Sequence, residues 1–401
     1  MESQNQTGEP DCSPAAGEPV PVAERRILRA VRRPFASVDP GLWDSLASLN
    51  HWATPFSSWA FQRAWWDAYG DNAHEETLVF VPVDALDDAE PVGILPLMHR
   101  HEVEPGDAAL LTTMRTHDSP ELTPVSPDWK ALFFGASYHA DYATILCGPW
   151  DLPAAASALV GYCASGGDEE HPELWDAVDL RRLRNTDPAA THLAAAFGAR
   201  EMTNGWTVTL EQEEVCPVAA LPDGATIDDF LATLGKKERH EIRRKVRRAE
   251  AAGEVALVDS TDLQADLPAF IDLHQKRWGA DGLFPDTPGG AQSRRFFERL
   301  FELMGTGGPL RLAFLTVDGR RIAACVSFET DDTLLYYNAG VDPEARELSP
   351  GVVMVERLVR RALASGRRQM DFLRGDEPYK YEWGAVNEPI QRLLVRRTGK
   401  R

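Results

Sequence analysis

The sequence predicts an α/β protein, of the α+β type, in which mixed sheets are flanked by helices. Three observations predict this class: apolar runs of strand length, helical spacings between them, and three consecutive strands joined by tight turns near the C-terminus. A chain of 401 residues is longer than one ordinary core requires, and it fits two domains of roughly 150 to 200 residues each. Its 43% hydrophobic and 26% charged residues are typical of a globular protein.

The first part of the chain, residues 21–215, is predicted to form one α/β domain. Residues 1–20 precede it as a disordered tail, because they combine Gly, Pro, Ser and acidic residues without apolar periodicity. After Ser58, a good N-cap residue, Phe61, Trp65 and Tyr69 recur at helical spacing. The other predicted elements are a hairpin at residues 78–83 and 92–97, strands at 142–146 and 175–180, and helices at 153–165 and 188–200.

A second domain is predicted over residues 225–401. The boundary is placed at residues 216–224, where apolar periodicity lapses and the charge balance changes. The domain opens with one helix that runs from residue 227 into the basic residues up to Arg248. Further helices are expected at residues 266–278, with Pro268 in the first turn, at 293–304 and at 350–365. The remaining predicted strands lie at 255–258, 310–317, 321–328, 334–339, 369–373 and 391–396.

The charge of the chain is distributed unevenly. Residues 1–220 hold 13 Lys and Arg against 34 Asp and Glu, a net charge of −21, whereas residues 221–401 hold 29 against 28, a net charge of +1. A negative protein field repels phosphate unless a local basic patch overcomes it. A generic nucleic-acid binder is therefore not expected.

The cysteines and histidines predict neither a disulfide framework nor a metal site. The five cysteines are scattered without CxxC or His/Cys spacing, and His240 and His274 lack partner ligands in the sequence. The chain contains no apolar run of 18 residues, and its first residues are polar. We therefore expect a cytoplasmic protein without a membrane span or a bound metal.

The start of the predicted helix at residue 350 is a candidate anion site. Ser349 precedes the helix, Pro350 suits its first turn, and Gly351 leaves room for a ligand. The free backbone N–H groups and the positive end of the helix dipole attract negative charge. By itself, this pattern is also typical of an ordinary capped helix.

Charged residues crowd the end of the strand predicted at 369–373. Asp371, Arg374, Asp376, Glu377 and Lys380 fall within ten positions. Because such groups are costly to bury without partners, they are expected to pair with one another, to line a cleft, or both. An ion-pair network that closes the domain is the structural alternative to a catalytic site.

Three strands, a helix with an open N-terminus, a strand and a final strand resemble the core of the GNAT acyltransferases. In such cores the central strand splays from its neighbour and the pantetheine arm of the acyl carrier pairs with the exposed strand edge. The family's pyrophosphate motif, Q/R-x-x-G-x-G/A, resembles residues 346–351, in which Arg346 and Gly351 match and Ser349 replaces the first glycine. The resemblance implies that Arg346, Ser349, Gly351 and Val352 bind the phosphates of acyl-CoA.

Several longer motifs occur between residues 225 and 396. They are FLATLGKK at residues 230–237, LHQKRW at 273–278, YYNAG at 336–340 and DFLRGDEPYKYEW at 371–383. Together they resemble the GNAT-like acetyltransferase family associated with cellulose biosynthesis (the CelD/BcsL type). That family is similar to the Fem peptidyltransferases, which contain two GNAT-like domains and take amino acids from aminoacyl-tRNA. Because residues 58–66 and 140–145 also resemble the first Fem domain, two GNAT domains in tandem are expected.

The resemblance assigns roles within the last motif. Lys380 follows Tyr379 as a lysine follows an aromatic residue in the Fem motif, where it stabilises the oxyanion of the tetrahedral intermediate. A cation beside developing negative charge lowers the barrier to acyl transfer. Asp376 or Asp371 is expected to accept the proton of the attacking ammonium. The candidate catalytic residues are thus Asp371, Arg374, Asp376, Tyr379 and Lys380.

The expected reaction is direct attack of an amine on the acyl group, without a serine or cysteine nucleophile. The donor is expected to be acyl-CoA, with acetyl-CoA as the favoured form, and the acceptor a small-molecule or peptide amine. Asn338 and Tyr337, on the strand before the candidate anion site, are expected to orient the carrier or the acceptor. The sequence leaves the oligomeric state open.

Two other functions remain open at this point. One is a Fem-like transferase that uses aminoacyl-tRNA, and the other is a module that binds a nucleotide-containing ligand without catalysis. The basic helix bears on this choice, because eight Lys or Arg residues fall between Lys236 and Arg248. Either it is a solvated helix that pairs with the acidic first half, or it clamps carrier phosphates or a tRNA acceptor stem.

Overall fold

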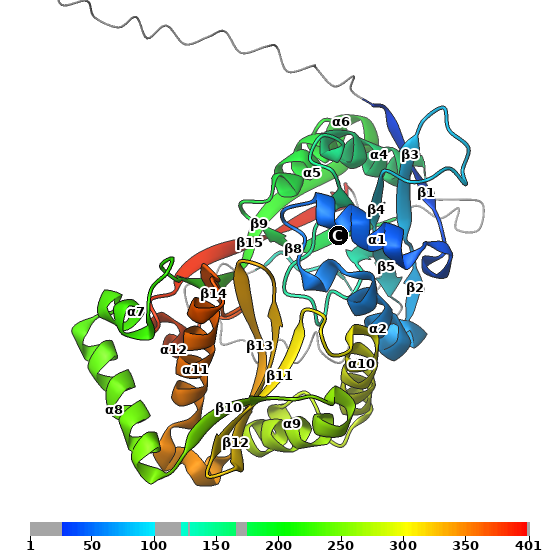
Figure 1. The fold of residues 1–401 in the computed structure, drawn as a ribbon. Coiled ribbons are helices and arrows are strands. Elements are labelled where there is room, and N and C mark those ends of the chain that lie inside the picture. The colour runs from blue at the N-terminus through cyan, green and yellow to red at the C-terminus, as the bar shows by residue number, and fades with distance from the viewer. Residues whose placement is uncertain (1–25, 101–121, 127–128, 166–174, 399–401) are drawn as a thin grey trace, which may run out of the picture.

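The structure of the protein is a computed structural model that describes residues 26–100, 122–126, 129–165 and 175–398. The predicted tail, residues 1–20, lies outside these ranges. Two helix-covered halves are joined by long strands (Figure 1). The predicted class, α/β with mixed sheets flanked by helices, is confirmed.

A mixed sheet runs through both halves. In the described part of the chain it has eleven strands, in the order β10-β11-β12-β13-β14-β9-β15-β8-β6-β5-β2. Its parallel pairs are β13 with β14 and β6 with β8. The bounds are β2 (Ala73–Glu75), β5 (Leu97–Arg100), β6 (Ala131–Phe134), β8 (Ala177–Arg184), β9 (Trp206–Ala220), β10 (Val255–Asp259), β11 (Leu310–Val317), β12 (Arg320–Glu329), β13 (Thr333–Val341), β14 (Gln369–Asp371) and β15 (Val386–Arg397).

The closing strand of each half lies in the sheet of the other half. β9 ends the first half in sequence, yet it pairs with β14 of the second half. β15 ends the second half, yet it pairs with β8 of the first. The two closing strands also pair with each other along their length, and they run side by side in Figure 1. Neither half therefore completes its sheet without the other.

A smaller sheet belongs to the first half. Its strands are β1 (Leu28–Arg32), β3 (Leu78–Pro82), β4 (Gly93–Leu95) and β7 (Leu146–Cys147), in the order β1-β3-β4-β7. The predicted hairpin is confirmed as the antiparallel pair β3–β4. Its second strand stops before Pro96, which has no N–H for a strand ladder, and the chain continues as β5 in the large sheet.

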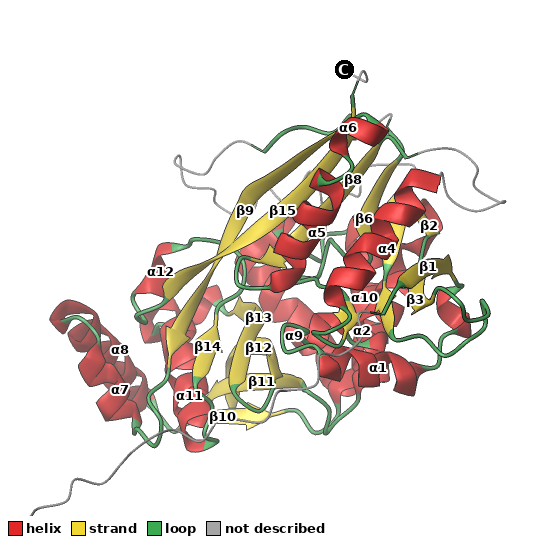
Figure 2. Ribbon diagram, turned by 90° about the horizontal axis from the view of Figure 1, so that it is seen from above, coloured by secondary structure: helices red, strands yellow, loops and turns green. Residues whose placement is uncertain are grey.

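Helices cover both faces of the large sheet. Figure 2 shows α4 and α5 over the first half, and α7 and α8 outside α11 at the edge of the second. No helix in the described ranges is both long enough and apolar enough to span a membrane. The bounds are α1 (Pro40–Leu49), α2 (Trp59–Tyr69), α4 (Leu152–Ser165), α5 (Pro188–Gly198), α6 (Glu201–Asn204), α7 (Ile227–Thr233), α8 (Lys236–Ala252), α9 (Leu263–Trp278), α10 (Pro288–Met304), α11 (Pro350–Ala364) and α12 (Pro378–Tyr381).

In the second half, each face of the large sheet is covered by a hydrophobic core of its own. α9 and α10 pack with α2 on the face that carries Ala324 and Val326 of β12. α7, α8 and α11 pack on the face that carries Ala323 and Cys325. Because side chains alternate along a strand, these are opposite faces of the same sheet. A ligand that lies between β13 and β14 would therefore reach from the face covered by α9 to the face covered by α11.

Several predicted elements need correction. The helix predicted from residue 227 to 248 is two helices, α7 and α8, because the extended backbone of Leu234 and Gly235 ends the first and begins the second. The strand predicted at 142–146 is wrong except for its last residue, since β7 begins at Leu146. α9 begins at Leu263 after the cap Asp262, so that Pro268 lies inside the helix and not in its first turn.

The predicted boundary at residues 216–224 is only partly a loop. Up to Ala220 these residues belong to β9, which crosses from one half to the other. The remaining segment leads into α7 through the capping box of Thr226 and Asp229. The division of the chain into domains at this point stays a prediction.

A buried histidine joins the first half to β13. His139 Nε2 lies 2.7 Å from the hydroxyl of Tyr69, and Tyr337 donates its hydroxyl proton to the backbone carbonyl of His139 at 3.0 Å. The imidazole stacks on Phe296 of α10 with ring centroids 4.1 Å apart. Burial, together with the positive charge of Arg374, lowers the pKa of His139 to about 3.

We predict that Gly340→Ala destabilises the fold. A Cβ at Gly340 would lie 2.3 Å from the backbone nitrogen of His274 and 2.4 Å from the carbonyl carbon of Leu273, because α9 packs directly on β13 here. Such overpacking costs roughly 1–3 kcal/mol. Gly161→Ala in α4 is the control, because its Cβ meets nothing within 4 Å. Equal urea midpoints for Gly340→Ala and the wild type would contradict the close packing.

We predict that His139 makes the protein less stable in acid. Between pH about 6.5 and about 3 the unfolded chain binds a proton at this residue and the native state does not, so the stability falls as the pH is lowered. His139→Gln should flatten the slope of the unfolding free energy against pH in this window by up to about 1.4 kcal/mol per unit. Exposed His51→Gln is the control, and an unchanged slope in His139→Gln would refute the assignment.

Candidate functional site

β13 and β14 diverge after a short parallel contact. Thr333, Leu334 and Leu335 pair with β14, whereas residues 336–341 of β13 have no partner on that side in the described part of the chain. The backbone N–H and C=O groups along this edge are consequently open to a ligand. This is the splayed strand that the resemblance led us to expect.

A β-bulge lies at the point of divergence. Val326 of β12 pairs with Asn338 and Ser327 with Tyr336, so Tyr337 has no partner in the register. A bulge bends its strand and redirects the side chains near it. The hydroxyl of Tyr337 is fixed by its hydrogen bond to the carbonyl of His139. The bulge therefore turns β13 away from β14 and holds it against the first half.

A cavity of about 440 Å³ lies beside this edge. It is lined by residues 336–339 of β13, by residues 372–374 and 377–380 after β14, by the end of α9 and by Asp141 from the first half. Of the predicted residues, Asn338, Tyr337, Arg374, Tyr379 and Lys380 line it together. Burial, together with the charge of Glu377, raises the pKa of Tyr379, so this phenol is neutral at pH 7.

Lys380 holds the loop that forms one wall of the cavity. It is 2% exposed, and its ammonium donates to the carbonyl oxygens of Leu373 (3.0 Å), Arg374 (2.6 Å) and Gly375 (3.0 Å). An ammonium group has three N–H donors, so all of them are used. An interaction with an oxyanion would require Lys380 to release one of these carbonyls.

Arg374 links the two halves at the cavity. Its guanidinium bonds the carboxylate of Asp141 and lies 3.9 Å from Glu214 of β9. Burial alone would lower its pKa, but the two carboxylates raise the pKa of Arg374 above its ordinary value. The arginine is thus a fully charged group whose charge is already balanced by protein carboxylates.

Asp371 and Asp376, the predicted proton acceptors, are not among the residues that line the cavity. Asp371 is buried, accepts hydrogen bonds from Tyr142 (2.7 Å) and from the backbone of Leu373 (2.7 Å), and lies 3.3 Å from Arg184. Burial raises its pKa against the opposing effect of Arg184. A base must reach the proton that it removes, and these contacts give Asp371 a structural position instead.

The predicted phosphate-binding residues gather at the start of α11. Ser349 has a left-handed backbone (φ 51°), and its N–H donates to the carbonyl of Arg346. The N–H of Val352 donates to the carbonyl of Ser349. Pro350 has no N–H, so Gly351 presents the remaining amide of the first turn. A Cβ at Gly351 would meet nothing within 4 Å, and packing therefore does not require this glycine.

The basic helix α8 lies beside this helix start. Its side-chain partners are Asp228 for Arg243 (2.7 Å), Glu241 for Arg244 (2.8 Å) and the Ser349 hydroxyl for Arg248 (2.7 Å). All of them come from the second half, so within the described ranges the expected pairing with the acidic first half is not found. Lys236, Lys237 and Lys245 have no carboxylate partner in the part of the chain that the structure describes.

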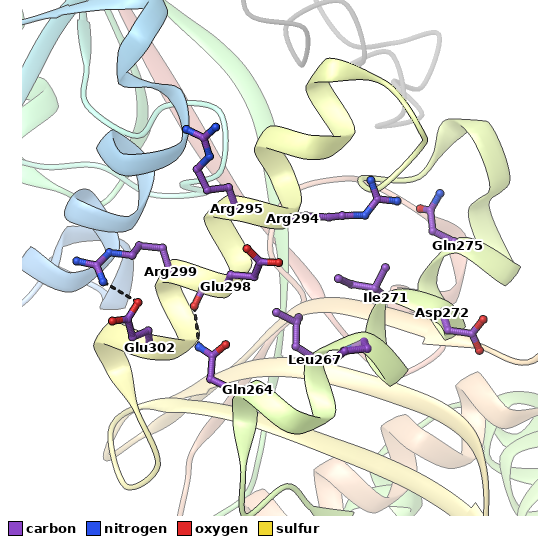
Figure 3. Close-up of a pocket in the computed structure, with 11 residues that line it drawn as sticks. Gln264, Leu267, Ile271, Asp272, Gln275, Arg294, Arg295, Glu298, Arg299 and Glu302 are labelled. Carbon is purple, nitrogen blue, oxygen red and sulfur yellow. Dashed lines mark hydrogen bonds and ion pairs between the residues drawn. The ribbon is translucent and has the colours of Figure 1, made fainter.

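A larger cavity, of about 620 Å³, lies between α9 and α10 and shares none of the predicted residues (Figure 3). Its rim is held by internal contacts: Arg299 pairs with Glu302 at 2.6 Å, and Gln264 donates to the carbonyl of Glu298 at 2.8 Å. Size alone therefore does not identify the site. The smaller cavity is the better candidate because it borders the free edge of β13.

Several cavity residues received no role from the sequence, among them Asp141, His274, Arg277 and Trp278. Asp141 comes from the first half, and nothing in a single sequence indicates that it meets Arg374. His274, Arg277 and Trp278 lie in the LHQKRW motif, which pointed to them only as a resemblance. Within the described ranges, no three His, Cys, Asp or Glu side chains are grouped as metal ligands.

Comparisons with known proteins bear on this geometry. Residues 236–381 match the sequence family described as the acetyltransferase (GNAT) domain. FemX has a similar fold, with a TM-score of 0.54, 10% identity, and coverage of 90% of this chain and 96% of its own. A conserved protein of unknown function from Bacteroides thetaiotaomicron VPI-5482 also has a similar fold, with a TM-score of 0.53, 11% identity, and coverage of 92% of this chain and 100% of its own. L-PGS from Bacillus licheniformis has a TM-score of 0.50, 10% identity, and coverage of 90% of this chain and 93% of its own.

At such low identities these three structures show a shared fold over nearly the whole chain. No curated protein sequence matches this one. The match to the family covers α8 to α12, which includes the free edge of β13, the start of α11 and most of the cavity wall. The chain therefore contains an acetyltransferase (GNAT) domain over residues 236–381, and this match supports an N-acyltransferase as the class of enzyme.

Proposed function

We propose that the protein transfers an acyl group, in the simplest case acetyl, from acyl-CoA to an amine by direct attack in a ternary complex. The observation that supports this most is the unpaired edge of β13 beside a cavity lined from both halves. The amine nitrogen forms the new bond to the acyl carbon, the carbon–sulfur bond breaks, and the thiol leaves with one proton. Because an alkyl amine is protonated at neutral pH, it loses two protons in all: a proton acceptor takes one before the attack, and the second is the one that leaves with the thiol.

The donor would bind along β13 and at the start of α11. Its pantetheine arm would pair with the edge at residues 336–341, next to Asn338. Its phosphates would meet the N–H of Gly351, and the guanidinium of Arg248 beside Ser349 adds a positive charge there. Arg346 and Val352 border the same position. The single free amide offers few backbone donors, which makes the arginines important for the affinity.

We assign the proton acceptor to Glu377. Unlike Asp371 and Asp376, it lines the cavity, and its side chain is 25% exposed. One carboxylate oxygen lies 2.9 Å from the ammonium of Lys380, which holds the carboxylate in place beside the cavity. Lys380 would position Glu377 and the loop of residues 373–375. Its direct role at the oxyanion, and that of Tyr379, stay predictions.

Transfer from aminoacyl-tRNA is the second candidate. It is favoured by the lysines of α8 that lack carboxylate partners among the described residues, on the helix whose Arg248 bonds Ser349 at the start of α11. The two donors are separated by one experiment: acetyl-CoA and an aminoacyl-tRNA are each incubated with an amine panel, and product is followed by mass spectrometry. Product from acetyl-CoA supports the first candidate, product that ribonuclease abolishes supports the second, and binding without product indicates a non-catalytic module. The narrower resemblance to the cellulose-associated family stays a prediction.

We predict that Glu377→Gln lowers kcat for thiol release from acetyl-CoA by about 10²- to 10⁴-fold, because the amide cannot accept the amine proton. Binding of acetyl-CoA, measured by calorimetry, should remain at the wild-type value. Asp376→Asn is the matched comparison, because Asp376 precedes Glu377 but does not line the cavity. If Asp376→Asn loses activity and Glu377→Gln retains it, the base has been misassigned.

We predict that Gly351→Glu weakens the binding of acetyl-CoA about tenfold or more. The new carboxylate would repel the phosphates of acetyl-CoA, and two like charges about 4 Å apart at a protein surface repel by roughly 1–4 kcal/mol. The fold should tolerate the change, since a side chain at this position meets open space. Gly351→Gln, of similar size and without charge, separates repulsion from bulk. Equal dissociation constants for the Glu and Gln variants would show that the phosphates bind elsewhere.

A further inference from the structure

The α9 side of the cavity carries a cation without a carboxylate partner. The guanidinium of Arg277 lines the cavity and forms no ion pair with any residue in the described ranges. The other cations of the cavity are neutralised, Arg374 by Asp141 and Lys380 by Glu377. Arg277 is thus the cation that remains available to a ligand.

Arg277 lines the cavity together with β13 and the loop after β14. Its charge opposes the effect of burial, which raises the pKa values of Tyr336 and Tyr379, and these tyrosines lie on those two walls of the cavity. It also adds to the effect of burial in lowering the pKa of His274 to about 4. Tyr336, Tyr379 and His274, which come from three elements, thus line the cavity together with Arg277.

Trp278 forms a platform beside Arg277. The residue is 39% exposed, although tryptophan is usually buried, and its Nε1 donates to the carbonyl of Ala339 on the free part of β13 at 3.4 Å. The guanidinium carbon of Arg277 lies 4.4 Å from the ring centroid. The ring fixes the planar cation in place, so less side-chain entropy is lost when an anion binds.

Carboxylates lie on the same cavity. Asp281, just after α9, and Glu377, in the loop after β14, both line it. One attracts an ammonium group and the other is the proposed proton acceptor. Because Glu377 is paired with Lys380, the charges that the cavity offers to a ligand are positive at Arg277 and negative at Asp281, which complements a molecule carrying both signs.

We propose that the acceptor is an amine that also bears an anionic group, a carboxylate or a phosphate, and that Arg277 binds this group against Trp278. The inference rests on the proposed function, because it names the substrate class of the same site. α9 and α11 lie on opposite faces of the sheet, so the acceptor would enter from the α9 side while the donor occupies the α11 side. This arrangement suits direct attack within a ternary complex.

Binding can be tested without turnover. Two pairs of amines are titrated by calorimetry into the protein saturated with CoA. Glucosamine 6-phosphate and glucosamine differ by a phosphate, and L-alanine and L-alaninamide differ by a carboxylate. A charge-assisted hydrogen bond is lost with the anion, so the anionic member of at least one pair should bind about 10- to 100-fold more tightly. The arm that shows the preference identifies phosphate or carboxylate as the anion.

Arg277→Gln should remove this preference and leave the affinity for the neutral amine unchanged. Lys276→Gln is the matched control, because this neighbouring cation is exposed, pairs with Asp272 and does not line the cavity. In turnover assays with acetyl-CoA, Arg277→Gln should raise KM for the anionic amine and leave kcat near the wild-type value. Both variants should unfold at the wild-type temperature.

The inference is wrong if neither anionic probe binds more tightly than its neutral partner, or if Arg277→Gln keeps the preference. These outcomes differ from a failure of the proposed function. Arg277-dependent binding of an anionic amine, with no product from any acyl donor, would retain the anion site and overturn acyl transfer. Acyl transfer to neutral amines as efficient as transfer to anionic amines would retain the proposed function and overturn the anion site.

Discussion

The structure depends on the exchange of the two closing strands, β9 and β15. Arg392 of β15 is fully buried and bonds Asp179 of β8 at 2.7 and 2.8 Å, while it lies 3.1 Å from Glu211 of β9. Breaking a buried pair of this kind leaves an uncompensated charge and costs roughly 3–5 kcal/mol. Because the arginine bonds the strands on both sides of β15, it fixes the order β9-β15-β8, and with it the way the two halves meet.

That order positions the candidate site. β9 occupies one edge of β14, and the bulge at Tyr337 turns β13 away from the other edge. The cavity forms where the strands separate, and the first half closes it through Asp141 and through the hydrogen bonds of His139. The first half is thus part of the site, although the GNAT family match begins only at residue 236.

The charged segment after β14 shows how one sequence pattern can carry two functions. The sequence indicated that Asp371, Arg374, Asp376, Glu377 and Lys380 either pair with one another or line a cleft, and the structure shows both. Lys380 and Arg374 line the cavity while their charges bind carbonyls and carboxylates of the protein. Asp371 is entirely internal. The sequence could not show which of these residues are internal and which line the cavity, because their partners Asp141, Tyr142 and Arg184 lie about 190 to 230 positions away in sequence.

The sequence by itself determined the local elements of the second half, including the meander of β11, β12 and β13 and the helix that begins at Pro350, because turns, caps and apolar periodicity act over a few residues. Its motifs also pointed to Asn338, Tyr379 and Lys380, which line the same cavity. The tertiary structure alone decided which half each closing strand joins, which carboxylate lines the cavity, and that Arg374 forms an ion pair while Arg277 forms none among the described residues. These depend on pairings between residues distant in the chain, and neither strand alternation nor charge spacing specifies the distant partner.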